Sequence, residues 1–184
     1  CKGPNVMLGY YNDPELTKSV FDADGWFHTG DMGYLEDGRF LMVTDRKKEI
    51  FKLSNGKFVA PQIVENIFRE SPIIDQIMVI GEHEKFASAI ISPNFKYFED
   101  WKVAKKVFYS NNDELITLPE VLLFFTSEVN KLNMRLSPPE RINRFRLVKE
   151  EWSPATGELS ATLKLRRKFI SEKYSDVVEQ VYNK

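Results

Sequence analysis

Cysteine, histidine and long apolar runs are all scarce in this sequence. Its single cysteine excludes an intramolecular disulfide, and its two histidines are too few and too isolated to suggest a zinc site. No segment approaches the roughly 18–20 apolar residues that span a bilayer, and no signal-peptide pattern opens the chain. A net charge of −1 argues against general nucleic-acid binding. We therefore expect a soluble, cytoplasmic polypeptide without a nucleic-acid partner, and peripheral contact with the inner membrane surface stays open.

What the sequence does contain can support a packed core. Of its 184 residues, 42% are hydrophobic and 13% are aromatic, which argues against disorder of the whole chain. The chain starts at Cys1 rather than at a methionine and enters strand and turn material almost at once. We expect it to be a piece of a longer protein.

Turn and helix-start signals divide the chain into short elements. Asp37-Gly38 between two apolar runs, 32–36 and 39–43, predicts a β-hairpin, and Asp13-Pro14 predicts a helix start. Further short strands are predicted at 26–29, 50–53, 58–60, 77–80, 86–91 and 143–148. Further helices are predicted from Pro61, over 95–108 and 119–136, and over a final segment with the apolar stripe Ile170, Tyr174, Val177, Val178 and Val181. Because neighbouring strands and separated helices are mixed from residue 49 onward, the predicted class is α+β.

Motifs on both sides of the hairpin resemble those of one enzyme superfamily. Thr29-Gly30-Asp31 comes before the hairpin, and the charged run 45–52 (DRKKEIFK) comes after it. Together they resemble the domain junction of the AMP-forming adenylating enzymes, which include acyl-CoA synthetases, luciferases and the adenylation domains of peptide synthetases. Segments 52–57, 94–136 and 160–167 (SATLKLRR) resemble most the long-chain fatty-acyl-CoA synthetases.

The resemblance implies a particular division of the chain. Residues 1–44 would end a large N-terminal domain, 45–48 would form a hinge, and 49–184 would form a small C-terminal lid. That lid would be an α+β domain with a short antiparallel sheet flanked by helices. The loop that holds the ATP phosphates and most of the acyl pocket would lie in the missing part of the large domain. We therefore expect the fragment alone to be inactive, and residues 1–44 to be loosely packed or paired with another copy.

The resemblance also implies a reaction in two steps. ATP, with Mg2+, and a long-chain fatty acid would give acyl-AMP and pyrophosphate, and CoA would then displace AMP to give acyl-CoA. None of these co-substrates would be bound tightly. The partners of the chain would be these small molecules and its own N-terminal domain. Neither the acyl chain length nor the oligomeric state can be read from the motifs.

Three residues near the junction match positions that contact the nucleotide or move the lid. Asp31 matches the ribose-binding aspartate, since one carboxylate can accept hydrogen bonds from two vicinal hydroxyls; a polar turn is the alternative. Arg46 matches a residue that contacts ribose or phosphate, and a surface ion pair is the alternative. Lys48 matches the hinge residue, and a solvated charge run is the alternative.

A lysine near the C-terminus is the predicted catalytic residue. Adenylation brings a carboxylate against the α-phosphate, and an ammonium group between these two anions would offset their repulsion. Lys164 matches the family's lysine, with Arg167 and Lys168 at the usual spacing, but Leu163 stands where the family usually has a glycine. Lys168 is the alternative lysine. A solvated basic first turn of the final helix is the alternative to any catalytic role.

The second step would use the other face of the lid. The resemblance places Lys52 and Gly56 in the loop 52–57 that lines the path of the thiol, where a glycine lets the backbone approach a ligand closely. Glu65 matches a family glutamate on the first lid helix, and a helix-surface role is the alternative.

Three other functions stay open. The first is a fatty-acyl-AMP ligase that passes its acyl group to a carrier protein. The second is a non-enzymatic α+β module whose basic segment 164–173 binds nucleic acid or anionic lipid. The third is a degenerate, inactive relative, because the lysine motif departs from the usual form.

Overall fold

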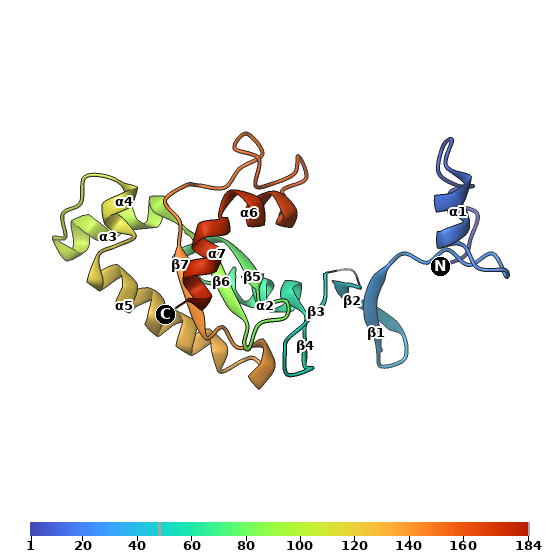
Figure 1. Cartoon of the computed structure of the whole chain (residues 1–184), viewed down its shortest axis with the longest axis horizontal. Coiled ribbons are helices and arrows are strands. Elements are labelled where there is room, and N and C mark those ends of the chain that lie inside the picture. The colour runs from blue at the N-terminus through green and yellow to red at the C-terminus, as the bar shows by residue number, and fades with distance from the viewer. Residues whose placement is uncertain (48, 184) are drawn as a thin grey trace. The chain divides into compact units, whose positions relative to one another are not determined.

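The computed structural model describes residues 1–47 and 49–183, and for residues 44–46 it gives the backbone alone. The chain divides into two compact units, Cys1–Glu49 and Ile50–Lys184, which we describe separately (Figure 1). The predicted hinge residue Lys48 lies outside the described residues. The hinge at 45–48 and the domain limits drawn around it therefore stay predictions.

The first unit begins with the predicted helix and contains the predicted hairpin. In α1 (Pro14–Val20) the Asp13 side chain accepts a hydrogen bond from the Leu16 backbone N–H at 2.9 Å. Strands β1 (Asp31–Glu36) and β2 (Phe40–Arg46) pair antiparallel. Three residues, 37–39, connect the strands, because Glu36 pairs with Phe40. Asp37 and Gly38 have left-handed φ values of 52° and 67°, and the Arg39 N–H donates to the Glu36 carbonyl at 3.0 Å to close the turn.

The strand predicted at 26–29 is wrong. Phe27 forms only one isolated bridge, to Phe21. The Asp22 carboxylate accepts hydrogen bonds from the backbone N–H groups of Asp24 at 3.0 Å and Trp26 at 2.8 Å. These local bonds hold the segment in a turn, because a short polar side chain competes with strand pairing for the backbone donors.

Apolar side chains of the hairpin are exposed. None of the side chains described in Cys1–Glu49 is buried. The exposed large apolar residues of the hairpin are Met32, Tyr34, Leu35, Phe40, Leu41, Met42 and Val43. A two-stranded hairpin has too little apolar surface to form a core of its own, and the side chains described in this unit form no buried core.

The second unit contains most of the regular structure. Its elements in chain order are β3 (Phe51–Lys52), β4 (Phe58–Val59), α2 (Pro61–Phe68), β5 (Ile74–Ile80), β6 (Ser88–Pro93), α3 (Phe95–Lys105), α4 (Asn112–Leu115), α5 (Pro119–Asn133), the 3₁₀ turn η1 (Pro138–Glu140), β7 (Arg144–Leu147), α6 (Arg167–Lys173) and α7 (Ser175–Tyr182). The predicted α+β class is confirmed, and each strand predicted from residue 50 onward is present.

The strands of the second unit form two small sheets. β3 pairs antiparallel with β4, and a second sheet has the order β5-β6-β7. β5 and β6 are antiparallel, as predicted, but β7 runs parallel to β6. The parallel strand follows from the helices α3 to α5, because a strand that returns in the same direction needs a long crossover connection.

Helices cover both faces of the three-stranded sheet (Figure 1). Successive side chains of a strand point to opposite faces, so Ile77 and Val79 join one core and Met78 joins the other. The first core continues through buried residues of α2, α3 and α5: Val64, Phe68, Phe98, Val121, Phe125, Val129 and Leu132. The second core contains Ile90, Val148, Trp152, Leu159, Ile170 and Tyr174, so α6 and the loop before it close the other face.

Two predicted helical regions differ in detail. The insert 94–136 holds three helices, since the short α4 lies between α3 and α5. The final helix is two helices, α6 and α7, which meet at Tyr174 with φ −109° and ψ 29°. The apolar stripe is confirmed, and Ile170, Tyr174 and Val181 are buried. The sequence did not indicate this break, because the helical spacing of the apolar residues continues across Tyr174.

Candidate active site

Lys164 lies in a small hairpin formed by residues 158–166. Leu159 and Leu165 pair antiparallel at its base. The Ser160 backbone N–H donates to the Lys164 carbonyl at 2.8 Å, and the Lys164 N–H donates to the Ser160 hydroxyl at 3.1 Å. The Lys164 side chain is exposed. The hydrogen bonds of the hairpin hold the Lys164 backbone in place, and its side chain with the ammonium group extends into solvent.

Leu163, the residue before this lysine, has a left-handed backbone. Its φ is 59°, in the region that glycine adopts at little cost and that other residues avoid. The Leu163 N–H donates to the Ser160 carbonyl at 2.8 Å, which closes the turn. The leucine thus occupies a conformation suited to the glycine that it replaces in the predicted motif.

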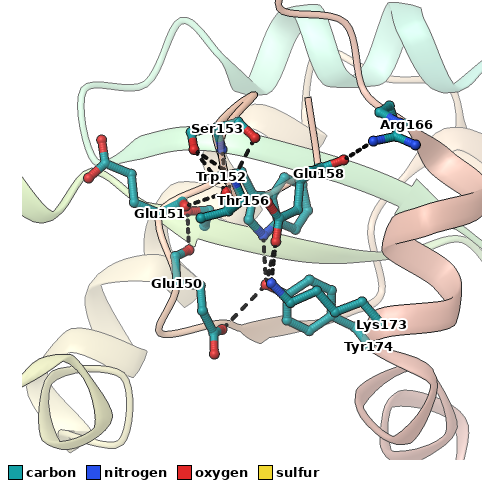
Figure 2. Close-up of polar contacts among 11 residues, drawn as sticks. Glu150, Glu151, Trp152, Ser153, Thr156, Glu158, Arg166, Lys173 and Tyr174 are labelled. Atoms are coloured by element: carbon teal, nitrogen blue, oxygen red, sulfur yellow. Dashed lines mark hydrogen bonds and ion pairs between the residues drawn. The ribbon is translucent and has the colours of Figure 1, made fainter. Parts of the chain in front are cut away.

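A buried carboxylate lies at the base of the hairpin (Figure 2). The Glu158 side chain is fully buried, and Lys173 of α6 donates to its Oε1 at 2.6 Å. The Tyr174 hydroxyl lies 3.4 Å from the same oxygen and accepts a hydrogen bond from Trp152 Nε1 at 3.2 Å. Burial is the largest single influence and acts to raise the pKa of Glu158, but the hydrogen bonds from Lys173, Thr156 and the backbone, together with the Lys173 charge, outweigh it, and the net pKa is lowered.

A second buried carboxylate ties α2 to the first residue of α6. Glu65 forms two hydrogen bonds with the Arg167 guanidinium, at 2.9 and 2.7 Å, and accepts one from the Val79 N–H at 2.8 Å. Its side chain is buried, so the helix-surface alternative for Glu65 is wrong. Burial raises the pKa of Glu65, and the Arg167 guanidinium opposes that rise.

The loop 52–57 is a tight turn between β3 and β4. Gly56 has φ 84°, and the nearest atom to a Cβ built there would be Lys52 Cε at 3.8 Å, so conformation rather than crowding favours glycine. The Lys52 ammonium lies 5.8 Å from the centre of the exposed Phe58 ring. Lys52 and Gly56 are exposed, and Leu53 between them is buried and anchors the turn.

The predicted nucleotide residues are at the open end of the first hairpin. Asp31 begins β1 and Arg46 ends β2, and the two are backbone partners across the hairpin. The Asp31 N–H donates to the Thr29 hydroxyl at 3.1 Å. The Arg46 side chain and all of Lys48 lie outside what the structure describes.

The predicted residues thus fall into three groups. Asp31 and Arg46 share the hairpin of Cys1–Glu49, whereas the loop 52–57 and the hairpin of Lys164 belong to Ile50–Lys184. Within the described ranges 1–47 and 49–183, no cluster of His, Cys, Asp and Glu could hold a metal ion. No helix in those same ranges is long and apolar enough to cross a membrane.

Sequence reasoning missed the contacts around Glu158. A signal was present in α6, because Lys173 lies three residues after the buried Ile170 and beside Tyr174, close to the apolar stripe. Charged groups in a protein interior are paired, so a lysine beside this stripe suggests a carboxylate partner. The sequence did not indicate which carboxylate supplies it.

Comparisons with known proteins place the chain among adenylate-forming enzymes. A family model described as "AMP-binding enzyme C-terminal domain" matches residues 48–184. A long-chain-fatty-acid–CoA ligase of Mycobacterium tuberculosis is 36% identical over 184 residues, which are 100% of this chain and 30% of that protein. Long-chain-fatty-acid–CoA ligase 1 of Homo sapiens is 34% identical over 99% of this chain and 26% of its own length. The chain therefore spans about a third or less of these relatives.

Solved structures show the same fold. The adenylation domain of a carboxylic acid reductase from Segniliparus rugosus, in complex with AMP and a co-purified carboxylic acid, matches with a TM-score of 0.81 and 25% identity. The match covers 98% of this chain and 27% of that structure. With the family model covering most of the chain, we conclude that this chain belongs to the AMP-binding enzyme C-terminal domain family.

Proposed function

We propose that the chain is the C-terminal part of an ATP-dependent long-chain fatty-acid–CoA ligase. The longer enzyme joins a fatty acid to AMP with release of pyrophosphate and then transfers the acyl group to CoA with release of AMP. The observation that carries the proposal is an exposed Lys164 directly after a left-handed Leu163, within a chain of this family. The names of the relatives support the substrate class.

Lys164 serves the first step. The fatty-acid carboxylate oxygen attacks the α-phosphorus of ATP, a new phosphorus–oxygen bond forms, and the bond to pyrophosphate breaks. The ammonium group lies between the two anions and stabilises the charge that gathers there. Even at an effective dielectric constant of about 20, an opposite charge about 4 Å away is worth about 4 kcal/mol. Such a term is large enough to change the rate by orders of magnitude.

The remaining predicted residues take the roles that the family motif gives them. Asp31 accepts hydrogen bonds from the ribose hydroxyls of the Mg2+–ATP substrate, and Arg46 contacts its ribose or phosphate. Lys48 lies in the hinge that lets the lid turn between the steps. The loop with Lys52 and Gly56 then lines the path of the CoA thiol, whose sulfur attacks the acyl carbonyl and displaces AMP.

Two other functions can be weighed against this proposal. The likeness to the A-PCP didomain of a carboxylic acid reductase favours a carrier-protein thiol as the second candidate acceptor. A basic module that binds nucleic acid or lipid is disfavoured, because Arg167 and Lys173 of α6 are committed to the buried carboxylates Glu65 and Glu158. A cytoplasmic location, peripheral membrane contact and inactivity of the isolated 184 residues stay predictions.

The proposal is tested in the longer protein that carries this chain, by measuring AMP release from ATP and palmitate with and without CoA. We expect Lys164→Ala to abolish acyl-AMP formation and to leave acyl-CoA synthesis from preformed acyl-AMP within about threefold of the original rate. Lys168→Ala is the control and should lose little in either step. Loss of adenylation in the Lys168 variant alone would move the catalytic role to that residue. Absence of acyl-AMP in the unaltered protein would refute the proposed function.

A further inference from the structure

We propose that Glu158 is a positioning residue for adenylation. Through Lys173 and Tyr174 it fixes the base of the hairpin 158–166 and thereby sets where the Lys164 ammonium lies. This inference rests on the proposed function, because it concerns the proposed catalytic lysine.

Two side chains reach one oxygen of Glu158, its Oε1. Its carboxylate is fully buried, and Lys173 Nζ reaches it from α6 at 2.6 Å. The neighbouring Tyr174 hydroxyl lies 3.4 Å from Glu158 Oε1, 3.4 Å from Glu150 Oε2 and 3.2 Å from Trp152 Nε1. Figure 2 shows Glu150, Trp152 and Glu158, from the segment after β7, meeting at the Tyr174 hydroxyl at the end of α6. The carboxylate is therefore the point at which the loop is attached to the helix.

The backbone on either side of Glu158 is fixed as well. Gly157 has φ 98°, and a Cβ there would lie 2.9 Å from the Phe169 ring. The Arg166 guanidinium donates to the Gly157 carbonyl at 3.1 Å and lies 5.1 Å from the centre of the same ring. Glu158 thus sits on a segment with little freedom to shift.

Backbone pairs of the hairpin connect Glu158 to Lys164. The Glu158 carbonyl accepts from the Arg166 N–H at 2.8 Å, Leu159 pairs with Leu165, and the Ser160 N–H donates to the Lys164 carbonyl. These three successive residue pairs lead from Glu158 at the base of the hairpin to Lys164. A displacement at Glu158 therefore moves or loosens the residue that holds the ammonium group.

Stability alone does not account for a charge pair at this place. A buried ion pair is often no more stabilising than apolar side chains of the same volume, because both charges lose their hydration. The ion pair between Glu158 and Lys173 instead fixes the position of the hairpin 158–166 relative to α6. A catalytic group needs a fixed position, since a misplacement of about 1 Å can lower the rate roughly 100-fold.

The test uses Glu158→Gln in the longer protein, which keeps the shape of the side chain and removes its charge. We expect acyl-AMP formation to slow roughly 10- to 100-fold and acyl-CoA synthesis from preformed acyl-AMP to change less than about threefold. Glu70→Gln is the matched control, because Glu70 also pairs with a cation, Arg135, but both side chains are exposed and neither belongs to the hairpin 158–166 or to α6. The control should alter neither step.

Hydrogen exchange supplies a readout that does not depend on activity. In Glu158→Gln the amides of Ser160 and Lys164 should exchange faster, while the amides of β5 and β6 stay as protected as before. Equal loss of both half-reactions, or faster exchange throughout the unit, would overturn the inference in favour of a general structural role. Unchanged adenylation and unchanged exchange would overturn it directly.

The two proposals fail in different ways. If the unaltered protein forms no acyl-AMP, or if Lys164→Ala retains adenylation, the proposed function or its lysine is wrong whatever Glu158→Gln does. If Lys164→Ala loses only adenylation while Glu158→Gln loses neither step, the proposed function stands and the positioning role is refuted.

Discussion

Leu163 has a left-handed backbone conformation that is unfavourable for a residue with a Cβ. It holds a left-handed backbone with a side chain that is 63% exposed, so little packing repays the strain. A left-handed conformation costs a residue with a Cβ about 1–2 kcal/mol, whereas glycine loses only about 0.5–1 kcal/mol through its greater freedom in the unfolded chain. The balance favours glycine at this position.

We therefore predict that Leu163→Gly raises the free energy of unfolding by about 0.5 kcal/mol. The control is Leu123→Gly, the same change at a similarly exposed position inside α5, where it should lower that free energy by about 1 kcal/mol. Urea unfolding followed by tryptophan fluorescence in a Trp26→Phe background measures both. Equal losses at the two positions would mean that the backbone at Leu163 carries no strain.

Two glutamates near the end of α2 provide a second comparison between single residues. Glu65 and Glu70 each pair with an arginine, but Glu65 is buried and Glu70 is exposed. Removing one partner of a buried pair leaves the other without compensation, so Glu65→Ala should cost about 3 kcal/mol of unfolding free energy. Glu70→Ala should cost much less, because solvent already screens that pair. The same urea titration would contradict this ranking if the two losses were equal.

At the scale of elements, β5, β6 and the hairpin of β1 and β2 were predictable because their signals are local. Asp37-Gly38 specifies its own turn, and the apolar runs specify buried strands. The parallel position of β7 was not predictable, since it depends on how the intervening helices cross the sheet. The break at Tyr174 was hidden for a related reason, because the stripe that predicts one helix continues through two.

The attachment of α6 to the hairpin 158–166 should depend on pH. The pKa of Glu158 is lower in the folded chain than its ordinary value. A carboxylate with a lowered folded-state pKa stabilises the fold above its unfolded pKa, and that contribution is lost as the pH falls through the folded value. Stability should therefore decrease on acidification below about pH 4.5, the ordinary range of glutamate.

Urea midpoints between about pH 7 and about pH 3 test this dependence. Glu158→Gln has no charge to titrate, so its acid loss of stability should be smaller than that of the unaltered chain. Glu70→Gln controls for the acid response of another paired glutamate. Identical slopes for Glu158→Gln and the unaltered chain would show that Glu158 does not titrate as inferred.

The whole molecule consists of two units that differ in how much they bury. No described side chain in Cys1–Glu49 is buried, whereas Ile50–Lys184 has two apolar cores. We predict that in the 184-residue chain the amides of β1 and β2 exchange at least about 100-fold faster than those of β5 and β6. Hydrogen exchange read by mass spectrometry measures this ratio. Comparable protection in both hairpins would indicate a second core that covers the first unit.

The candidate site could be predicted only in part. Asp31, Arg46, Lys52, Gly56 and Lys164 could be proposed as site residues because they lie in contiguous motifs, and their roles stay predictions. Glu65 was recognised, but its burial was not, because its partner Arg167 is 102 residues away in the sequence. The role of Glu158 was missed because neither its burial nor its partner could be read from the local sequence. Contacts of this kind become visible only when the sheet brings distant segments together.

The parallel pairing of β6 with β7 also sets an order of events during folding. The β5–β6 hairpin closes a short loop, which takes microseconds, whereas β7 can join only after a segment of about 50 residues has closed. The hairpin of Lys164 packs on the face that includes Val148 and Trp152, just beyond β7. We therefore expect the segment that carries the proposed lysine to pack against this sheet only after β7 has joined it.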